Sequence, residues 1–97
     1  MEQVKTRSKI DIYLSKQYKV IFHNDNKTTF EFVALCLHQI FDKNMEDAIK
    51  LTYQVDQIGY CIAGNGYMKD IAETKKNQVL DLAKQNGFPF QVTVEEE

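Results

Sequence analysis

The first candidate for chemistry is a run of three short polar side chains, Asn24, Asp25 and Asn26, which follows an apolar segment at residues 18–22. These side chains are rich in hydrogen-bond acceptors, and an ammonium group carries only donors. One interpretation is therefore a site for a cation beside an apolar wall. The other is an ordinary turn between a strand and a helix, because Asn and Asp are common turn residues.

Signs of catalysis are weak elsewhere in the sequence. No His-x-x-x-His pair and no Cys/His cluster has metal-ligand spacing, so we expect no metal and no cofactor. The glycines around Asn65 are followed by Tyr67 rather than by the Lys-Ser/Thr pair of a phosphate-binding loop. Cys61 and His23 have the residue types of a nucleophile and a base, but nothing in the sequence brings them together. We expect a protein that is not an enzyme.

A strand and a helix must position the polar run. We predict a strand at residues 17–23 and a helix from Thr29 to about Phe41, because apolar residues recur there at helical spacing. Thr28 and Glu31 have the spacing of a capping box, which marks a helix start.

The remaining elements are predicted as a helix at 45–57, a strand at 60–64, a helix at 68–85 and a strand at 90–94. Asn44 is the expected N-cap of the second helix, Gly59 its C-terminal glycine, and Asn65-Gly66 a turn. The order β-α-α-β-α-β predicts an α/β (α+β) fold, a two-layer sandwich in which three helices cover one face of a three-stranded sheet. We expect the sheet to be antiparallel, and the sequence leaves the strand order open.

Length and charge narrow the class of protein. Ninety-seven residues make one domain, and a net charge of −2 argues against nucleic acid as the main partner. No apolar run approaches the roughly 20 residues of a membrane span, so no membrane contact is expected. Two isolated cysteines and the lack of a secretory signal favour free thiols and a cytoplasmic location. We interpret residues 1–16 as a flexible N-terminal extension and 17–97 as the folded domain, which we expect to be a monomer.

Three separated blocks resemble the Clp protease adaptor family ClpS. Residues 18–33 resemble its core signature, usually written YKVILxNDDxTPMEFV, and residues 72–75 match its AETK motif. Residues 86–90 resemble its N-x-HPL block, and the closing residues 93–95 fit its C-terminal TLE. The resemblance runs in order from about Tyr18 to Glu95.

The resemblance implies a bacterial adaptor without enzymatic activity. Such adaptors bind proteins that carry an N-degron, a free amino terminus with Leu, Phe, Tyr or Trp as the first residue. They deliver these proteins to the N-terminal domain of a ClpA- or ClpC-type AAA+ unfoldase, which feeds the ClpP peptidase.

The resemblance also implies which residues bind the amino group. Asn24 and Asp25 match the family residues, but the second family Asp is Asn26 here, and a family His late in the second helix aligns with Asp56. Charge-assisted hydrogen bonds to an ammonium are strong. Our hypothesis is that Asp56 replaces the carboxylate that is absent at Asn26. The alternative is that Asp56 is only a solvated residue and the site has decayed.

The family's apolar pocket is altered as well. Its gatekeeper Met aligns with Phe30, and a second pocket Met aligns with Thr52. The other pocket positions fall on Thr28, Val33, Val55 and Phe90. Phe30 is bulkier than Met and moves its wall inward, whereas Thr52 is smaller and moves its wall outward. We therefore predict a pocket that takes a flat or unbranched side chain, with shifted preferences among first residues. The alternative is that Phe30 only packs in the core.

The family's unfoldase-facing surface aligns with the third helix, at Asp70, Glu73, Thr74 and Lys75. On composition alone this segment is an ordinary solvated helix face. Two functions therefore stay open at this point. One is an N-degron adaptor, and the other is a divergent member that docks on the unfoldase and modulates it without recognising amino termini.

Overall fold

A three-stranded antiparallel sheet with the order β2-β1-β3 forms the base of the structure, a computed structural model that describes residues 16–97. The elements are β1 (Tyr18–His23), α2 (Phe30–Gln39), α3 (Met45–Ile58), β2 (Tyr60–Tyr67), α4 (Lys69–Gln85) and β3 (Gln91–Glu96). The predicted order of elements and the antiparallel sheet are confirmed. The predicted extension at 1–16 lies outside the described residues except for Lys16, and it stays a prediction.

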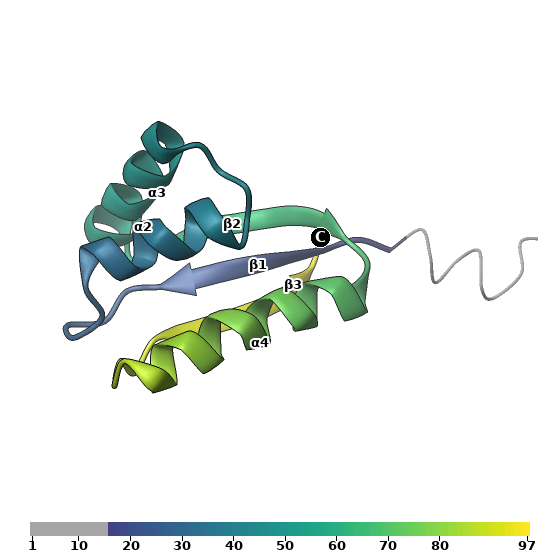
Figure 1. Cartoon of the computed structure of the whole chain (residues 1–97). Helices are drawn as coiled ribbons and strands as arrows, with labels where there is room; N and C mark the ends of the chain where they lie inside the picture. Colours follow the sequence, from purple (N-terminus) through teal and green to yellow (C-terminus); the bar gives the residue numbers. More distant parts are fainter. Residues whose placement is uncertain (1–15) are drawn as a thin grey trace, which may run out of the picture.

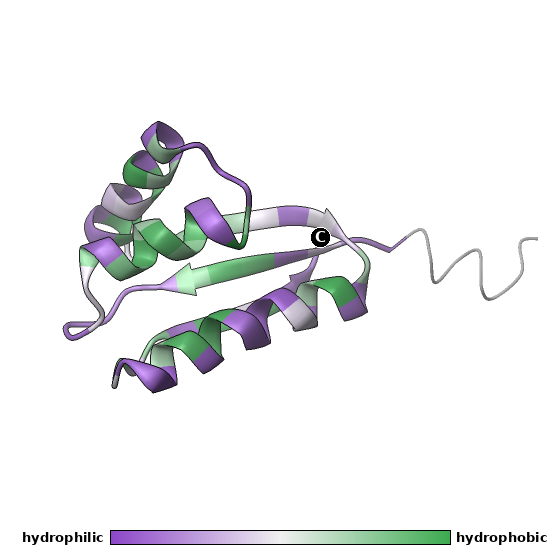
Figure 2. Cartoon of the chain, in the orientation of Figure 1, coloured by the Kyte–Doolittle hydropathy of each residue, from purple (hydrophilic) through white to green (hydrophobic). Residues whose placement is uncertain are grey.

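Successive side chains of a strand point to opposite faces of the sheet. The helices cover one of these faces and leave the other without a covering layer. Val20 and Phe22 of β1 and Cys61 and Ala63 of β2 are fully buried, whereas Ile62, on the opposite face of β2, is 41% exposed. The two-layer sandwich with helices over one face is thereby confirmed. Figure 2 shows the hydrophobic residues along much of β1, the central strand.

The helices pack on this face in two groups. Figure 1 shows α2 and α3 next to each other, with α4 alongside β3. Ala72 and Ala83 of α4 are buried where it meets the sheet, and their small side chains allow the helix to approach the strands closely. Phe22 packs edge-on against Phe41 and Phe90, with ring centroids 5.4 and 4.9 Å apart. Burying one such side chain stabilises a fold by about 1.5–3 kcal/mol.

The ends of α3 agree with the sequence. Asn44 is the N-cap, and its side-chain oxygen accepts a 2.8 Å hydrogen bond from the backbone N–H of Asp47. Gly59 ends the helix at φ +107°, a left-handed conformation that favours glycine.

The turn predicted at Asn65-Gly66 is wrong. β2 continues to Tyr67, which pairs with Tyr18, and the register of β1 with β2 shifts at two places before that pair. Gly66, at φ +76°, therefore belongs to an irregular stretch of the strand rather than to a hairpin. Pairing with β1 outweighs the local turn preference of the Asn-Gly sequence.

Candidate functional site

The polar loop after β1 is anchored to the end of α3. The backbone N–H of Asn24 donates a 2.9 Å hydrogen bond to the carbonyl of Gly59, whose own N–H donates to the carbonyl of Val55. These two bonds tie the loop to the last turn of α3, the turn that carries Asp56. The loop and the late part of α3 therefore lie side by side, although about thirty residues separate them in the sequence.

Asp25 holds the loop in shape. One carboxylate oxygen accepts hydrogen bonds from the backbone N–H groups of Lys27 and Thr28, and the other accepts from the Thr28 hydroxyl, at 2.7–2.8 Å. Partial burial on its own would raise the pKa of Asp25, but the hydrogen bonds from Thr28 and Lys27 together lower it from its usual value. These bonds show that Asp25 fixes the shape of the loop, and its role in amine binding stays a prediction.

The start of α2 differs by one residue from the prediction. Thr29, not Thr28, is the N-cap, and its hydroxyl oxygen accepts a 3.2 Å hydrogen bond from the N–H of Phe32. The predicted capping box is therefore wrong, because Glu31 lies one position short of the partner that Thr29 would need. The Thr28 hydroxyl is instead engaged by Asp25.

Nine of the ten residues predicted for amine binding and the side-chain pocket line one cavity of about 260 Å³. They come from the loop, from α2 and from α3: Asn24, Asp25, Asn26, Thr28, Phe30, Val33, Thr52, Val55 and Asp56. Amide and carboxylate groups gather on the loop side, and apolar groups come from the two helices. The structure thus brings these residues together, while their role in binding stays a prediction.

The acceptor side of the cavity includes one exposed carboxylate. Asp56 receives only a long hydrogen bond, 3.4 Å, from the side-chain amide of Gln57, and residues 16–97 contain no ion pair to it. Asn24 and Asn26 are exposed beside it in the same cavity. The negative charge of Asp56 is therefore available to a cationic group that enters the cavity.

The apolar side has one wall of β-branched residues and one aromatic residue. Thr52 is 3% exposed, and its hydroxyl donates to the carbonyl of Ala48 at 2.7 Å, so it adds no unsatisfied polar group to the wall. Phe30 is half-buried and lies outside the core cluster. Its ring packs edge-on against Tyr53, with centroids 4.9 Å apart. The structure thus favours the cavity-wall interpretation of Phe30 over the core interpretation.

Phe90 is the predicted pocket residue that the structure does not bring to the cavity. It is 5% exposed and packs against Phe22 and Phe32 in the core. It also lines a separate shallow hollow next to β3. Tyr53 was not singled out from the sequence. Tyr53 is 58% exposed, and its ring packs against that of Phe30.

The predicted unfoldase surface lies on α4. Asp70 and Thr74 are exposed, and Glu73 forms an ion pair with Lys76 at 3.0 Å. Lys75 is half-buried: its ammonium group donates a 2.8 Å hydrogen bond to the carbonyl of Ile40, at the end of α2.

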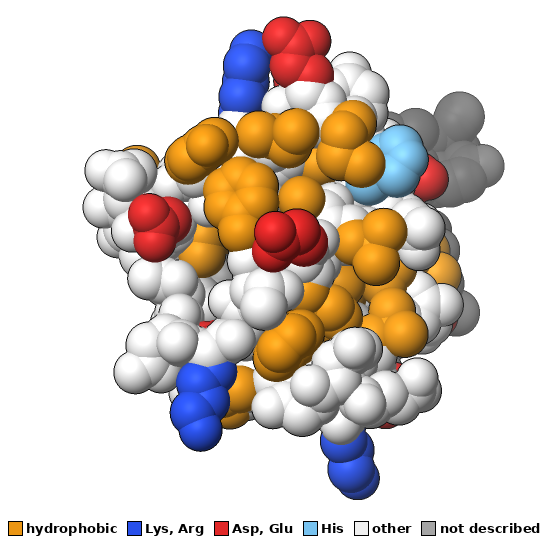
Figure 3. Space-filling view, turned by 60° about the vertical axis from the view of Figure 1, so that its left-hand side comes forward, with side chains coloured by type: hydrophobic (Ala, Val, Ile, Leu, Met, Phe, Trp, Pro, Cys, Tyr) orange, Lys and Arg blue, Asp and Glu red, His pale blue; other side chains and the backbone are white. Residues whose placement is uncertain are grey.

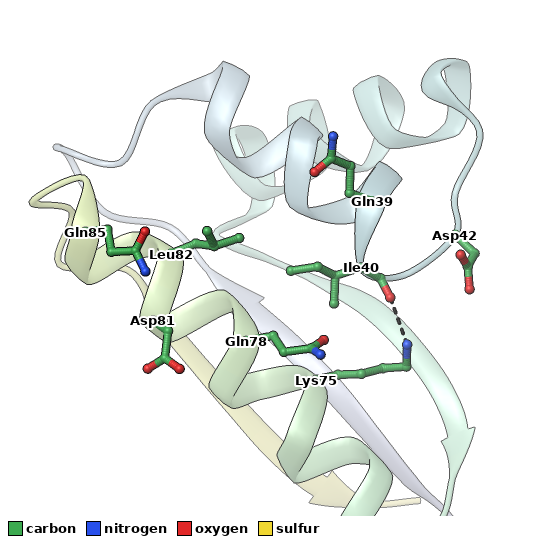
Figure 4. Close-up of a pocket in the computed structure, with 8 residues that line it drawn as sticks. All are labelled: Gln39, Ile40, Asp42, Lys75, Gln78, Asp81, Leu82 and Gln85. Carbon is green, nitrogen blue, oxygen red and sulfur yellow. Dashed lines mark hydrogen bonds between the residues drawn. The ribbon is translucent and has the colours of Figure 1, made fainter.

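Lys75 also contacts two aromatic rings. Its ammonium group lies 5.6 Å from the ring centroids of both Phe41 and Tyr67. Lys75 lines a hollow of about 580 Å³ between the end of α2 and α4. Figure 4 shows its ammonium group next to the carbonyl of Ile40. Lys75 therefore links α2 and α4 in addition to any role at an interface.

The arrangement of the cysteines does not support a nucleophile. Burial raises the pKa of Cys36 and Cys61 to about 12, with Lys43 lowering that of Cys61 to a lesser degree. Cys61 lies on the covered face of the sheet, whereas His23 on the open face hydrogen-bonds Thr93 at 2.7 Å. The structure does not bring Cys61 and His23 together. Within residues 16–97 no cluster of His, Cys, Asp or Glu could hold a metal ion.

No helix in the described part of the chain is both long and apolar enough to cross a membrane.

Comparisons with known proteins agree on one family. The family model described as "ATP-dependent Clp protease adaptor protein ClpS" matches residues 14–93. The chain is 45% identical to the ATP-dependent Clp protease adapter protein ClpS of Clostridium acetobutylicum, over 98% of this chain and 91% of that one. It is 47% identical to the protein of the same name from Zymomonas mobilis, over 80% of this chain and 72% of that one.

A solved structure shares the fold. The structure of Agrobacterium tumefaciens ClpS2 bound to L-phenylalaninamide superimposes with a TM-score of 0.79 at 34% sequence identity, covering 84% of this chain and 98% of that one. The resemblance read from the three sequence blocks is confirmed, as is the expectation of an adaptor rather than an enzyme. Because the family model matches residues 14–93 and the relatives above are 45% and 47% identical, the chain belongs to the ClpS family of ATP-dependent Clp protease adaptors.

Proposed function

We propose that this adaptor binds proteins that carry an N-degron, with the free α-amino group on the acceptor side of the cavity and the first side chain on its apolar side. It then delivers them to a ClpA- or ClpC-type AAA+ unfoldase for degradation. The observation that carries this proposal is the convergence of nine residues from three segments on one cavity with a polar and an apolar side.

The amine subsite consists of three acceptors. Asn24 and Asn26 offer amide oxygens, and Asp56 offers the one carboxylate not already engaged by the loop backbone. An ammonium group carries three donors, so this set matches its hydrogen-bonding capacity. Asp56 supplies the charge that the family pattern places at position 26, which is the compensation proposed from the sequence.

The side-chain subsite has the size for one residue. The cavity volume of about 260 Å³ exceeds the roughly 150 Å³ of a protein cavity that holds a benzene molecule. A phenylalanine side chain and its amino group therefore fit, in agreement with the L-phenylalaninamide bound to the similar ClpS2. Phe30 is stiff and Thr52 is β-branched, so we expect first residues that are flat or unbranched at Cβ: Leu, Phe, Tyr or Trp.

The test compares peptides that differ only at residue one, each with a free or an acetylated amino terminus. Acetylation removes the ammonium and several charge-assisted hydrogen bonds worth about 1.5–3 kcal/mol each. We expect binding of free Phe-led and Leu-led peptides and a loss of at least about a hundredfold on acetylation. Equal affinity of both forms, or strongest binding of Ile-led or Val-led peptides, would contradict the proposal.

Delivery requires a second surface, and we assign it to α4 around Asp70, Glu73, Thr74 and Lys75. Asp70 and Thr74 are exposed, so they are accessible to the N-terminal domain of the unfoldase. Titration of that purified domain into the protein should show binding, and Asp70→Ala should weaken it. We also expect the protein to act as a monomer in the cytoplasm of a bacterium.

A second candidate function rests on the departures at Asn26 and Asp56. In that case the protein docks on the unfoldase and modulates it without recognising amino termini. Binding to the unfoldase domain together with equal affinity for free and acetylated peptides would favour this alternative.

A further inference from the structure

A second hollow of about 260 Å³ adjoins the amine cavity and is lined almost entirely by apolar side chains. It lies between α2 and α3, and its lining residues are Phe30, Glu31, Ala34, Leu35, Met45 and Ile49. We call it the α2–α3 groove. Phe30 lines both hollows, so they meet at this residue.

The groove is unusually apolar for an exposed surface. Leu35, Met45 and Ile49 are 41%, 45% and 38% exposed, and Tyr53, which packs against Phe30, is 58% exposed. Figure 3 shows hydrophobic side chains gathered over α2 and α3 in the upper half of the view. Contiguous exposed apolar groups of this kind mark interaction sites more often than single exposed residues do.

The two hollows follow one seam between the helices. On α3, Ile49 and Met45 precede Thr52, a residue of the amine cavity, by three and seven positions. At a rise of 1.5 Å per residue this is about 4.5 and 10.5 Å along the helix. An extended peptide advances about 3.3 Å per residue. A chain whose first residue lies in the amine cavity and that runs along α3 towards Met45 therefore reaches the groove with its second to fourth residues.

We propose that the α2–α3 groove receives an apolar side chain from positions two to four of the same substrate whose first residue occupies the amine cavity. This inference rests on the proposed function and deepens it: the protein recognises a short amino-terminal segment rather than a single residue. Continuity through Phe30 favours this occupant, and among the described residues Glu31 is the only charged one in the lining.

The test uses Phe-led peptides that carry Leu or the similarly shaped Asn at position two, three or four, with alanine elsewhere. Burying about half of a leucine side chain should favour Leu over Asn by roughly fivefold to tenfold at one of these positions. Leu35→Asn and Ile49→Asn should remove this preference while leaving the affinity for L-phenylalaninamide unchanged. The matched control is Ile71→Asn on α4, where the native side chain is 45% exposed, and it should change neither quantity.

Each other outcome overturns the inference. If L-phenylalaninamide binds but no position prefers Leu, or the preference persists in both groove variants, the groove does not contact substrate and the amine cavity stands alone. If L-phenylalaninamide does not bind to the unaltered protein, the proposed function itself fails. A concentration-dependent dimer that Leu35→Asn abolishes would assign the groove to a second copy of the chain. If the thermal unfolding midpoint of Leu35→Asn or Ile49→Asn falls, Met45→Gln is used in its place, because Met45 also lines the groove.

Discussion

Replacing Asp56 by asparagine tests the central electrostatic claim about the amine cavity. The substitution keeps the shape of the side chain and its ability to accept a hydrogen bond. It removes the carboxylate that, among residues 16–97, lines the cavity without a hydrogen bond from the loop backbone. If an ammonium group binds there, its affinity must fall.

The expected magnitude follows from exposure. Hydrogen bonds to charged groups contribute about 1.5–3 kcal/mol when shielded, whereas exposed ion pairs contribute about 0–1 kcal/mol. Asp56 is exposed but borders a cavity, so we expect an intermediate loss of about 1–2 kcal/mol, or roughly fivefold to thirtyfold in Kd. The loss should shrink as salt is raised, because salt screens exposed charges.

The assay is titration calorimetry or fluorescence anisotropy with a free Phe-led peptide. Glu46→Gln is the matched control, because it removes one exposed carboxylate from α3 away from the cavity and changes the net charge equally. Asn26→Asp in the Asp56→Asn background should restore affinity by returning a carboxylate to the other side of the site. Unchanged peptide affinity in Asp56→Asn, or an equally large loss of affinity in Glu46→Gln, would refute the claim that Asp56 replaces the carboxylate absent at Asn26.

Three further predictions concern stability and reactivity. Gly64→Ala should lower the free energy of unfolding by about 2 kcal/mol or more in denaturant titrations, because the added methyl would lie 2.9 Å from a Phe41 ring carbon and against the hydroxyl of Tyr67. A near-neutral result would contradict this packing. With pKa values of about 12, the thiols of Cys36 and Cys61 should react with a thiol reagent only at the rate of unfolding. Rapid labelling of the native protein would refute their burial. Partial burial on its own would raise the pKa of Asp25, but hydrogen bonds lower that pKa in the folded protein. Its stabilising contribution is therefore present above the ordinary carboxyl pKa and is lost as pH falls through the folded value. Unfolding midpoints against pH should therefore lose part of their acid dependence when that carboxylate is replaced by an amide.

Local patterns in the sequence predicted the features that depend on neighbouring residues. Asn44 and Gly59 delimit α3 as expected, because each acts through hydrogen bonds within one helical turn. The start of α2 was ambiguous for a physical reason. Two adjacent threonines can each act as N-cap. Thr28 donates its hydroxyl to the Asp25 carboxylate, and Thr29 takes the N-cap role.

Features that depend on distant contacts could not be predicted from such patterns. The predicted Asn65-Gly66 turn is replaced by a continued strand, because Tyr67 pairs with Tyr18 at the start of β1. The family alignment placed Phe90 at the pocket, but edge-on packing against Phe22 and Phe32 holds it in the core. The convergence of the loop on α3 follows from the bond between Asn24 and the carbonyl of Gly59, which no local pattern indicates.

The role of Lys75 shows why variants on the proposed unfoldase surface need two readouts. Its ammonium group donates to the carbonyl of Ile40 at the end of α2, and Phe30 at the start of the same helix lines the amine cavity. Since α2 has ten residues, about 15 Å separate its two ends. Truncating Lys75 therefore removes a contact of α2 as well as the proposed contact with the unfoldase.

A delivery defect in Lys75→Ala would therefore not identify a docking residue by itself. Asp70 and Thr74 are better suited to that purpose. Within residues 16–97 the carboxylate of Asp70 accepts a hydrogen bond only from the N–H of Ile71, and the Thr74 hydroxyl donates only to the carbonyl of Asp70. Neither side chain reaches α2. Loss of unfoldase binding in Asp70→Asn, with unchanged stability and unchanged affinity for L-phenylalaninamide, is the result that assigns docking to α4.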